Sequence, residues 1–245
     1  MLSSLVIDGV LALDAGSIGS QLSFEDHTKI KAILLSHGHY DHIRGVPSFL
    51  FINSARVTRV YGLPHTLSLL TSRMMDGLVS PDFTDENSFL RRVAAELLPL
   101  TTEATVDIED YTVTVHAMTH PFPVAGLEVV DAKGKSIFYS GDTGPGFAVV
   151  WERIRPNLLI IDVTFPDRLT KAAEDSSHLC PETFGRELDD FRRLRGYLPP
   201  VVTTHCSPRH EPEIAAGVNI VVERLGADVR IGREGMAPDV TPAST

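Results

Sequence analysis

The chain has 245 residues, of which 43% are hydrophobic and 22% are charged, and its formal net charge at pH 7 is −10. This is a globular composition, and the acidic balance disfavours long nucleic acid as a partner. Two cysteines, Cys180 and Cys206, are too few for a disulfide framework. The opening MLSSLVIDGV lacks a signal-peptide pattern, and no apolar run approaches the roughly 18 residues that a membrane span needs. We therefore expect a cytoplasmic protein without a membrane partner.

Short apolar runs rich in β-branched residues alternate with stretches of helical spacing. Strands are predicted at Leu5–Ile7, Leu11–Leu13, Ala32–Leu35, Val57–Tyr61, Val113–Met118, Leu127–Val130, Ser136–Tyr139, Leu158–Ile161 and Val201–Thr203. Helices are predicted at Ile43–Phe51, Pro64–Met75, Pro181–Leu194 and Glu211–Leu225. Residues 88–98 fit either helical spacing or a short strand from Ala94 to Leu98. The alternation predicts an α/β protein. No linker divides the chain, so we predict one domain over residues 1–237 and a disordered tail over 238–245.

Four predicted strands end on a residue that can bind a metal ion or transfer a proton. AILLS leads into His37, IFYSG into Asp142, LLII into Asp162 and VVTT into His205. Strand ends are where α/β folds place their chemistry, because the sheet holds these side chains rigidly while the loops stay open. These four residues are therefore candidates for one functional site.

The strongest signal is the run His37-Gly38-His39-Tyr40-Asp41-His42, which follows a buried strand. Three histidines and an aspartate within such a short loop can converge on metal ions. Imidazole and carboxylate ligands suit Zn²⁺, Mn²⁺ and Fe. A polar loop whose histidines only form hydrogen bonds is the alternative interpretation, and the density of ligands argues against it.

Three further residues complete a set of seven nitrogen and oxygen ligands. They are His120 in THPFP, Asp142 in SGDTGP and His205 in TTHCSP. Seven ligands suffice for two divalent ions that share a bridging carboxylate, and Asp142 is the expected bridge. We assign His37, His39 and His120 to one ion, and Asp41, His42 and His205 to the other. Zn²⁺ is the expected metal, with Mn²⁺ and Fe as alternatives.

HGHYDH is similar to the HxHxDH signature of the metallo-β-lactamase superfamily, and LDAG at Leu13–Gly16 resembles its early strand-turn motif. His120, SGDTG and His205 follow in the order of that family, and the resemblance covers Leu5 to about Met236. It implies a four-layer αββα sandwich with the metals at one edge. The family usually has one more strand before the position of Leu5, and we expect this chain to lack it, either because its start is truncated or because the first sheet has lost an edge strand.

Within that superfamily, YSGDTGP, IIDVTFP and SHLCPETF resemble the phosphodiesterase branch, which contains ribonuclease Z and the class II cyclic-nucleotide phosphodiesterases. DAGS, GLPHT, SPDFT and THCSP look closest to the bacterial class II enzymes. The resemblance implies that His178 is a proton donor and that Asp162 orients it. Asp162 stands where the family usually has Glu. Asp41 is expected to serve catalysis as well as metal binding.

We therefore expect a metal-dependent phosphodiesterase that cleaves a cyclic nucleotide of the 3',5'-cAMP type or another small phosphodiester. Two cations can share a hydroxide that attacks phosphorus, while His178 protonates the leaving oxygen. The alternatives are a ribonuclease Z-like RNA-processing endonuclease, a thioester or lactam hydrolase, and a non-catalytic metal-binding scaffold. A homodimer is left open.

Overall fold

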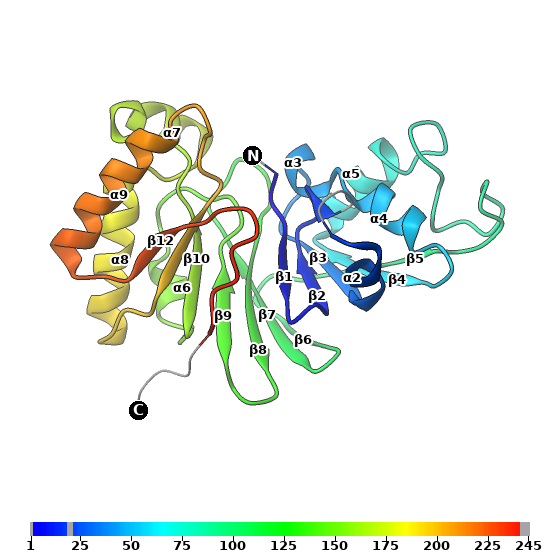
Figure 1. Cartoon of the computed structure of the whole chain (residues 1–245), viewed down its shortest axis with the longest axis horizontal. Coiled ribbons are helices and arrows are strands. Elements are labelled where there is room, and N and C mark those ends of the chain that lie inside the picture. The colour runs from blue at the N-terminus through cyan, green and yellow to red at the C-terminus, as the bar shows by residue number, and fades with distance from the viewer. Residues whose placement is uncertain (1, 19–21, 241–245) are drawn as a thin grey trace. The chain divides into compact units, whose positions relative to one another are not determined.

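The structure, a computed structural model, describes residues 2–18 and 22–240. The chain divides into two compact units, an N-terminal unit of residues 2–102 and a C-terminal unit of residues 103–245. Each unit builds one β-sheet with its own helices and its own apolar core (Figure 1). The expectation of a single domain over residues 1–237 stays a prediction.

The N-terminal unit contains a five-stranded sheet in the order β1-β2-β3-β4-β5. Its strands are β1 (Leu5–Ile7), β2 (Leu11–Leu13), β3 (Ala32–Leu35), β4 (Thr58–Gly62) and β5 (Ala95–Pro99). Its helices are α2 (Phe24–Lys29), α3 (Tyr40–Ile43), α4 (Val46–Ile52) and α5 (Pro64–Arg73). β1 is antiparallel to β2, and the other pairs are parallel. Every residue of β3 is buried, which explains its uninterrupted apolar sequence.

The C-terminal unit contains a seven-stranded sheet in the order β12-β11-β10-β9-β8-β7-β6. Its strands are β6 (Thr105–Ile108), β7 (Tyr111–Ala117), β8 (Ala125–Asp131), β9 (Ser136–Tyr139), β10 (Leu158–Asp162), β11 (Val201–Thr204) and β12 (Val229–Ile231). Its helices are α6 (Ala148–Trp151), a 3₁₀ turn η1 (Asp167–Leu169), α7 (Thr170–Ser176), α8 (Pro181–Arg195) and α9 (Glu211–Leu225). The half from β9 to β12 is parallel, and the half from β6 to β9 is antiparallel.

All nine predicted strands form, most of them within a residue or two of their predicted ends. The ambiguous segment 88–98 ends in β5, which continues to Pro99, so the strand interpretation is correct. The predicted helix Ile43–Phe51 is wrong in one respect, because Arg44 and Gly45 separate α3 from α4. The sequence prediction missed β6, β12 and the short helices α2, α6 and α7. Of the predicted disordered tail, residues 241–245 lie outside the described residues, and 238–240 form no regular element.

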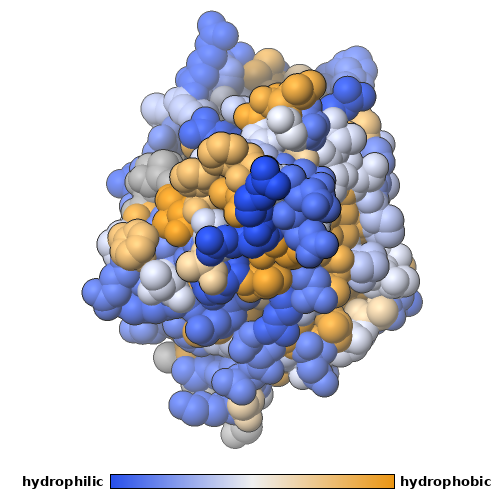
Figure 2. Space-filling view, turned by 90° about the vertical axis from the view of Figure 1, so that its right-hand side faces the viewer, coloured by the Kyte–Doolittle hydropathy of each residue, from blue (hydrophilic) through white to orange (hydrophobic). Residues whose placement is uncertain are grey.

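No helix in the described part of the chain has the length and hydropathy to cross a membrane. On the face drawn in Figure 2, apolar side chains lie in small groups among polar ones. The segment between α5 and β5 contributes three strongly exposed apolar residues, namely Leu78, Val79 and Phe89.

His27 on α2 makes the stability of the N-terminal unit sensitive to pH. Its side chain is buried, and its ring stacks on Phe49 with 5.2 Å between centroids. Burial lowers the pKa of His27, because desolvation penalises the charged imidazolium. A pKa that is lower in the folded than in the unfolded state means that protonation favours unfolding. Stability is therefore full above the unfolded pKa of about 6.5 and falls as the pH drops below it.

His27→Phe keeps an aromatic ring against Phe49 and cannot titrate. Between about pH 8 and about pH 5.5, the wild type should lose more free energy of unfolding than the variant, by on the order of 1 kcal/mol. Urea titrations of both proteins at the two pH values measure this difference, and all other titrating groups are common to both. Equal losses in the two proteins would contradict this assignment of pH sensitivity to His27.

Glu187 on α8 anchors the loop that follows β9. Its buried carboxylate accepts hydrogen bonds from the backbone N–H groups of Gly146, at 2.7 Å, and Phe147, at 3.2 Å. The same loop carries Asp142. Burial raises the pKa of Glu187, and the two backbone hydrogen bonds oppose that shift. This one side chain therefore ties a helix of the C-terminal unit to a loop with a predicted site residue.

Glu187→Ala should lower the free energy of unfolding by about 1–3 kcal/mol, because it leaves two N–H groups without their acceptor. Glu187→Gln keeps one acceptor oxygen and should cost less. Glu182→Ala on the same helix removes an exposed carboxylate paired with Arg186, and it should cost no more than about 1 kcal/mol. Denaturant unfolding of the three variants measures the order, and a Glu187→Ala loss no larger than that of Glu182→Ala would rule the anchor out.

Candidate active site

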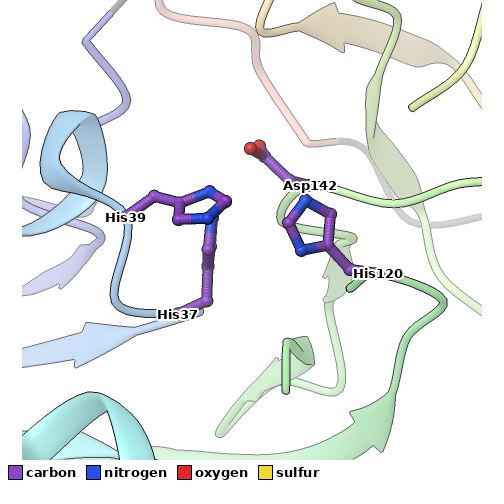
Figure 3. Close-up of side chains that lie close together, drawn as sticks. All are labelled: His37, His39, His120 and Asp142. Carbon is purple, nitrogen blue, oxygen red and sulfur yellow. The ribbon is translucent and has the colours of Figure 1, made fainter. Parts of the chain in front are cut away.

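The loop after β3 brings together the four predicted residues of the N-terminal unit. His37 and His39 have ring centroids 4.6 Å apart, and His37 and His42 have centroids 4.2 Å apart. Nε2 of His42 lies 3.7 Å from a carboxylate oxygen of Asp41. Figure 3 shows His37 where β3 ends and His39 on the loop that leads into α3. The histidines and the aspartate of HGHYDH thus form one cluster of potential ligands.

A buried carboxylate that the sequence prediction gave no role fixes this loop. Asp14 is fully buried, and its two oxygens accept hydrogen bonds from the backbone N–H of Ser36, at 2.7 Å, and from the Ser36 hydroxyl, at 2.8 Å. The same carboxylate lies 2.7 Å from Nδ1 of His42. Oγ of Ser36 lies 3.0 Å from Nδ1 of His37. Because Nδ1 of both rings faces this network, Nε2 is the nitrogen that each ring offers to a metal ion.

The LDAG turn is shaped to hold the ligand loop. Asp14 adopts a positive φ of 57°, which is uncommon for a residue with a side chain. A Cβ atom on Gly16 would lie 1.8 Å from the carbonyl oxygen of Asp41, so only glycine fits this contact. The backbone N–H of Ala15 donates to the carbonyl of His42 at 2.7 Å. Asp14 and Gly16 therefore explain why an early turn resembles the family motif: it supports the HGHYDH loop.

In the C-terminal unit, His120 follows β7, and Asp142 follows β9 (Figure 3). Ligand atoms of His120 and Asp142 lie within 4.8 Å of each other. Ligand atoms of Asp142, His178 and His205 also lie within 4.8 Å of one another. Nε2 of His205 lies 3.5 Å from Oδ2 of Asp142. Asp142 is buried, with 2% of its side chain exposed. The predicted residues of this unit thus form a second cluster, in which Asp142 lies near His120 and also near His178 and His205.

His178 and His205 share a hydrogen-bonding centre at the end of β10. Nδ1 of His178 lies 2.7 Å from a carboxylate oxygen of Asp162, which is fully buried. The Thr164 hydroxyl lies 2.5 Å from the other oxygen of Asp162 and 2.8 Å from Nδ1 of His205. The two imidazole rings stack with 5.2 Å between centroids and 7° between planes. The pairing of His178 with Asp162 therefore has the geometry that a carboxylate-oriented proton donor requires.

Thr164 was not identified from the sequence as a functional residue. Its hydroxyl determines how the ring of His205 is oriented. The hydroxyl has one proton, which the short contact to Asp162 takes, so it accepts from Nδ1–H of His205. Nε2 of His205 then carries the lone pair that a metal ion could use. His205 itself has a positive φ of 60°, a conformation that is uncommon outside glycine and frequent at functional sites. The only sequence signal for Thr164 was its place two residues after Asp162.

The two cysteines and His116 are buried in the C-terminal unit. Cys206 is buried and burial raises the pKa of its thiol to about 11, so it is not an activated nucleophile. Cys180 is also buried, at the position that precedes α8. His116 is buried in β7 and its ring lies 5.9 Å from that of Phe138. The arrangement therefore supports chemistry by histidines and carboxylates rather than by a cysteine.

Three curated relatives share parts of the sequence. Ribonuclease J of Methanocaldococcus jannaschii is 31% identical over 126 residues, which are 51% of this chain and 25% of the relative. Ribonuclease Z of Methanococcus maripaludis is 25% identical over 277 residues, covering 90% of this chain and 86% of the relative. The 3',5'-cyclic-nucleotide phosphodiesterase 1 of Saccharomyces cerevisiae is 31% identical over 70 residues, covering 27% of this chain and 19% of the relative. The chain thus spans most of the ribonuclease Z and much smaller parts of the other two.

Two solved structures have a similar fold. Yeast PDE1 matches with a TM-score of 0.73 and 20% identity, over 85% of this chain and 67% of that one. The metallo-β-lactamase fold protein YhfI of Bacillus subtilis matches with a TM-score of 0.74 and 16% identity, over 95% of this chain and 88% of that one. These matches confirm the predicted metallo-β-lactamase fold. The model of the beta-lactamase superfamily domain matches residues 6–205, and the chain therefore belongs to the metallo-β-lactamase superfamily of hydrolases.

Proposed function

We propose that this protein is a metal-dependent phosphodiesterase that hydrolyses a small phosphodiester, with a 3',5'-cyclic nucleotide as the favoured substrate. The observation that carries the proposal is the pair of His178 and the fully buried Asp162, 2.7 Å apart beside Asp142 and His205. Membership of the superfamily and the likeness to phosphodiesterases and ribonuclease Z agree with this class of reaction.

The donors in each unit have the chemistry of a binding site for divalent transition metals. Nδ1 of His37, His42 and His205 is engaged by a hydroxyl or carboxylate, as is usual for histidines that bind a metal through Nε2. We assign His37, His39 and His120 to one ion, Asp41, His42 and His205 to a second, and Asp142 to both. Zn²⁺ is the favoured metal, with Mn²⁺ and Fe as alternatives. When bound, such ions act as Lewis acids toward phosphoryl oxygens and lower the pKa of water.

The chain's own contribution to the reaction is proton transfer by His178. Cleavage of a cyclic nucleotide expels an alkoxide, which leaves poorly unless it is protonated. A proton on Nε2 of His178 can go to the departing oxygen, while Nδ1–H stays bonded to Asp162. The negative carboxylate favours the charged imidazolium, and it fixes the ring for the transfer. General acid catalysis of this kind is worth about 10²–10⁴ in rate.

A ribonuclease Z-like endonuclease is the second candidate, because the ribonuclease Z of Methanococcus maripaludis aligns with 90% of this chain. Both candidates use the same residues and differ in the size of the substrate. Turnover of 3',5'-cyclic AMP and cleavage of a 3'-extended precursor tRNA by the same preparation distinguish them. Cleavage of the tRNA without turnover of the cyclic nucleotide would overturn our choice of substrate.

The metal assignment predicts two divalent ions per chain. Chelation should lower the melting temperature, because ions that bind only the folded state stabilise it by mass action. Asp142→Ala should lose at least one ion and nearly all hydrolysis of bis(p-nitrophenyl) phosphate. Elemental analysis and turnover measure both effects. An Asp142→Ala variant with two ions and normal turnover would refute Asp142 as the bridging ligand.

The role of His178 predicts a dependence on the leaving group. His178→Ala should retain both metals and lose about 10²–10⁴ of its rate on cyclic AMP. On bis(p-nitrophenyl) phosphate the loss should be much smaller, because p-nitrophenolate leaves without a proton. Asp162→Asn should show a milder version of the same pattern, since it disturbs the orientation of His178 without removing the imidazole.

Turnover of both substrates by each variant, beside metal analysis, tests the role of His178. Equal losses on the two substrates with intact metals would exclude His178 as the general acid. Loss of metal in His178→Ala would make His178 a ligand, in agreement with its place beside Asp142 and His205. In that case the assignment of His205 would have to be revised.

A further inference from the structure

The C-terminal unit presents an aromatic side chain next to the proposed metal ligand His120. Phe122 is 49% exposed, and among the described residues of this unit it is the one exposed Phe, Tyr or Trp. Its ring centroid lies 6.5 Å from that of His120. The backbone N–H of Phe122 faces Nδ1 of His120 at 3.5 Å. The position of this apolar ring is thus coupled to that of a proposed ligand.

The rings continue from Phe122 through the candidate site. The His120 and His178 centroids are 5.5 Å apart, and those of His178 and Phe165 are 5.9 Å apart. Phe122 therefore begins a series of neighbouring aromatic rings that includes the proposed proton donor His178. A ligand held at His120 and His178 by its phosphate has its remaining atoms within reach of such a ring.

The local sequence holds Phe122 in place. It lies between Pro121 and Pro123 in THPFP. Pro121 has a fixed φ, and Pro123 restricts the residue before it to extended conformations. The backbone of Phe122 is therefore restricted before any ligand arrives, which reduces the entropy that binding would cost. An exposed ring on a rigid backbone beside a polar site is suited to stack on a flat aromatic group.

We propose that Phe122 is a stacking platform for the base of a nucleotide substrate. This inference rests on the proposed phosphodiesterase function and adds the source of its specificity. Every nucleobase has a flat π-face, so one ring provides affinity without selecting a particular base. The ligand class is therefore a phosphate ester that carries an aromatic base, rather than a sugar phosphate alone.

Binding of two ligands to the metal-loaded protein isolates this contact. Adenosine 5'-monophosphate and ribose 5-phosphate share the phosphate and the ribose, and only the first has a base. In calorimetric titrations, Phe122→Ala should weaken binding of adenosine 5'-monophosphate by about 5- to 150-fold, the usual range for loss of one stacked base. Binding of ribose 5-phosphate should change little. Phe122→Tyr should retain the preference for the base, and Phe122→Leu should lose most of it.

Phe89→Ala is the matched control, because Phe89 is 81% exposed and lies in the N-terminal unit outside the candidate site. It should leave both affinities unchanged. Equal weakening of the two ligands in Phe122→Ala, or no change in either, would overturn the platform. Retention of the base preference by Phe122→Leu would also overturn it, because size alone would then explain the contact.

Turnover of bis(p-nitrophenyl) phosphate by the wild type reports on the phosphodiesterase proposal separately. A wild type that hydrolyses this diester but binds both ligands equally refutes the platform and leaves the phosphodiesterase in place. A wild type that hydrolyses no diester refutes the proposed function. The proposal that Phe122 is a stacking platform is then tested only by the ratio of the affinity for adenosine 5'-monophosphate to that for ribose 5-phosphate. A ratio that falls only in Phe122→Ala and Phe122→Leu supports the proposal.

Discussion

In each unit, a buried aspartate fixes the Nδ1 side of two histidines, and the arrangement of the candidate ligands in that unit depends on this interaction. In the N-terminal unit, Asp14 contacts His42 directly and His37 through the Ser36 hydroxyl. In the C-terminal unit, Asp162 contacts His178 directly and His205 through the Thr164 hydroxyl. Both aspartates are fully buried, and burying a carboxylate is costly unless hydrogen bonds compensate it. The backbone N–H groups of Ser36 and Thr143 supply further donors. The same small network is thus built twice, and it sets the direction of four imidazole rings.

The stacked rings of His178 and His205 differ in the hydrogen-bond partner of Nδ1, and this difference is the basis for proposing different roles for them. The partner of His178 is a carboxylate, which is the kind of group that favours the imidazolium form of a proposed proton donor. The partner of His205 is a hydroxyl, which accepts from Nδ1–H and leaves Nε2 as the nitrogen suited to a metal. Both side chains are slightly exposed, at 12% and 13%, so accessibility does not distinguish them. The hydrogen-bond partners therefore provide the argument for His178 as the acid and His205 as the ligand.

Periodicity predicted most of the strands and long helices, and strand ends pointed to histidines and aspartates that the structure gathers into clusters within each unit. β3, β9, β10 and β11 are short and mostly buried, and each ends at or just before a candidate site residue, so the signal is strong and local. Ser36, Thr164 and the role of Asp14 were not predictable, because a hydroxyl or carboxylate that orients another side chain has no spacing of its own in the sequence. β12 and β6 were missed for a different reason. They lie at the two edges of the sheet, are only partly buried and have just 4 and 3 residues, so their alternation is too short to give a clear signal.

The charges of the C-terminal helices bear on the size of the substrate. In the run from Arg186 to Arg195, arginines are interleaved with acidic residues, and two of its arginines pair with acids. Arg186 contacts Glu182, Arg193 contacts Asp190, and Arg224 of α9 contacts Asp189. On η1, Arg168 is held by Glu213. Affinity for a long phosphate backbone comes from cations that neutralise many phosphates, and arginines already paired with carboxylates contribute little to it. With a net charge of −10, this surface offers little to a long phosphate backbone, which agrees with the small phosphodiester that we propose as the substrate.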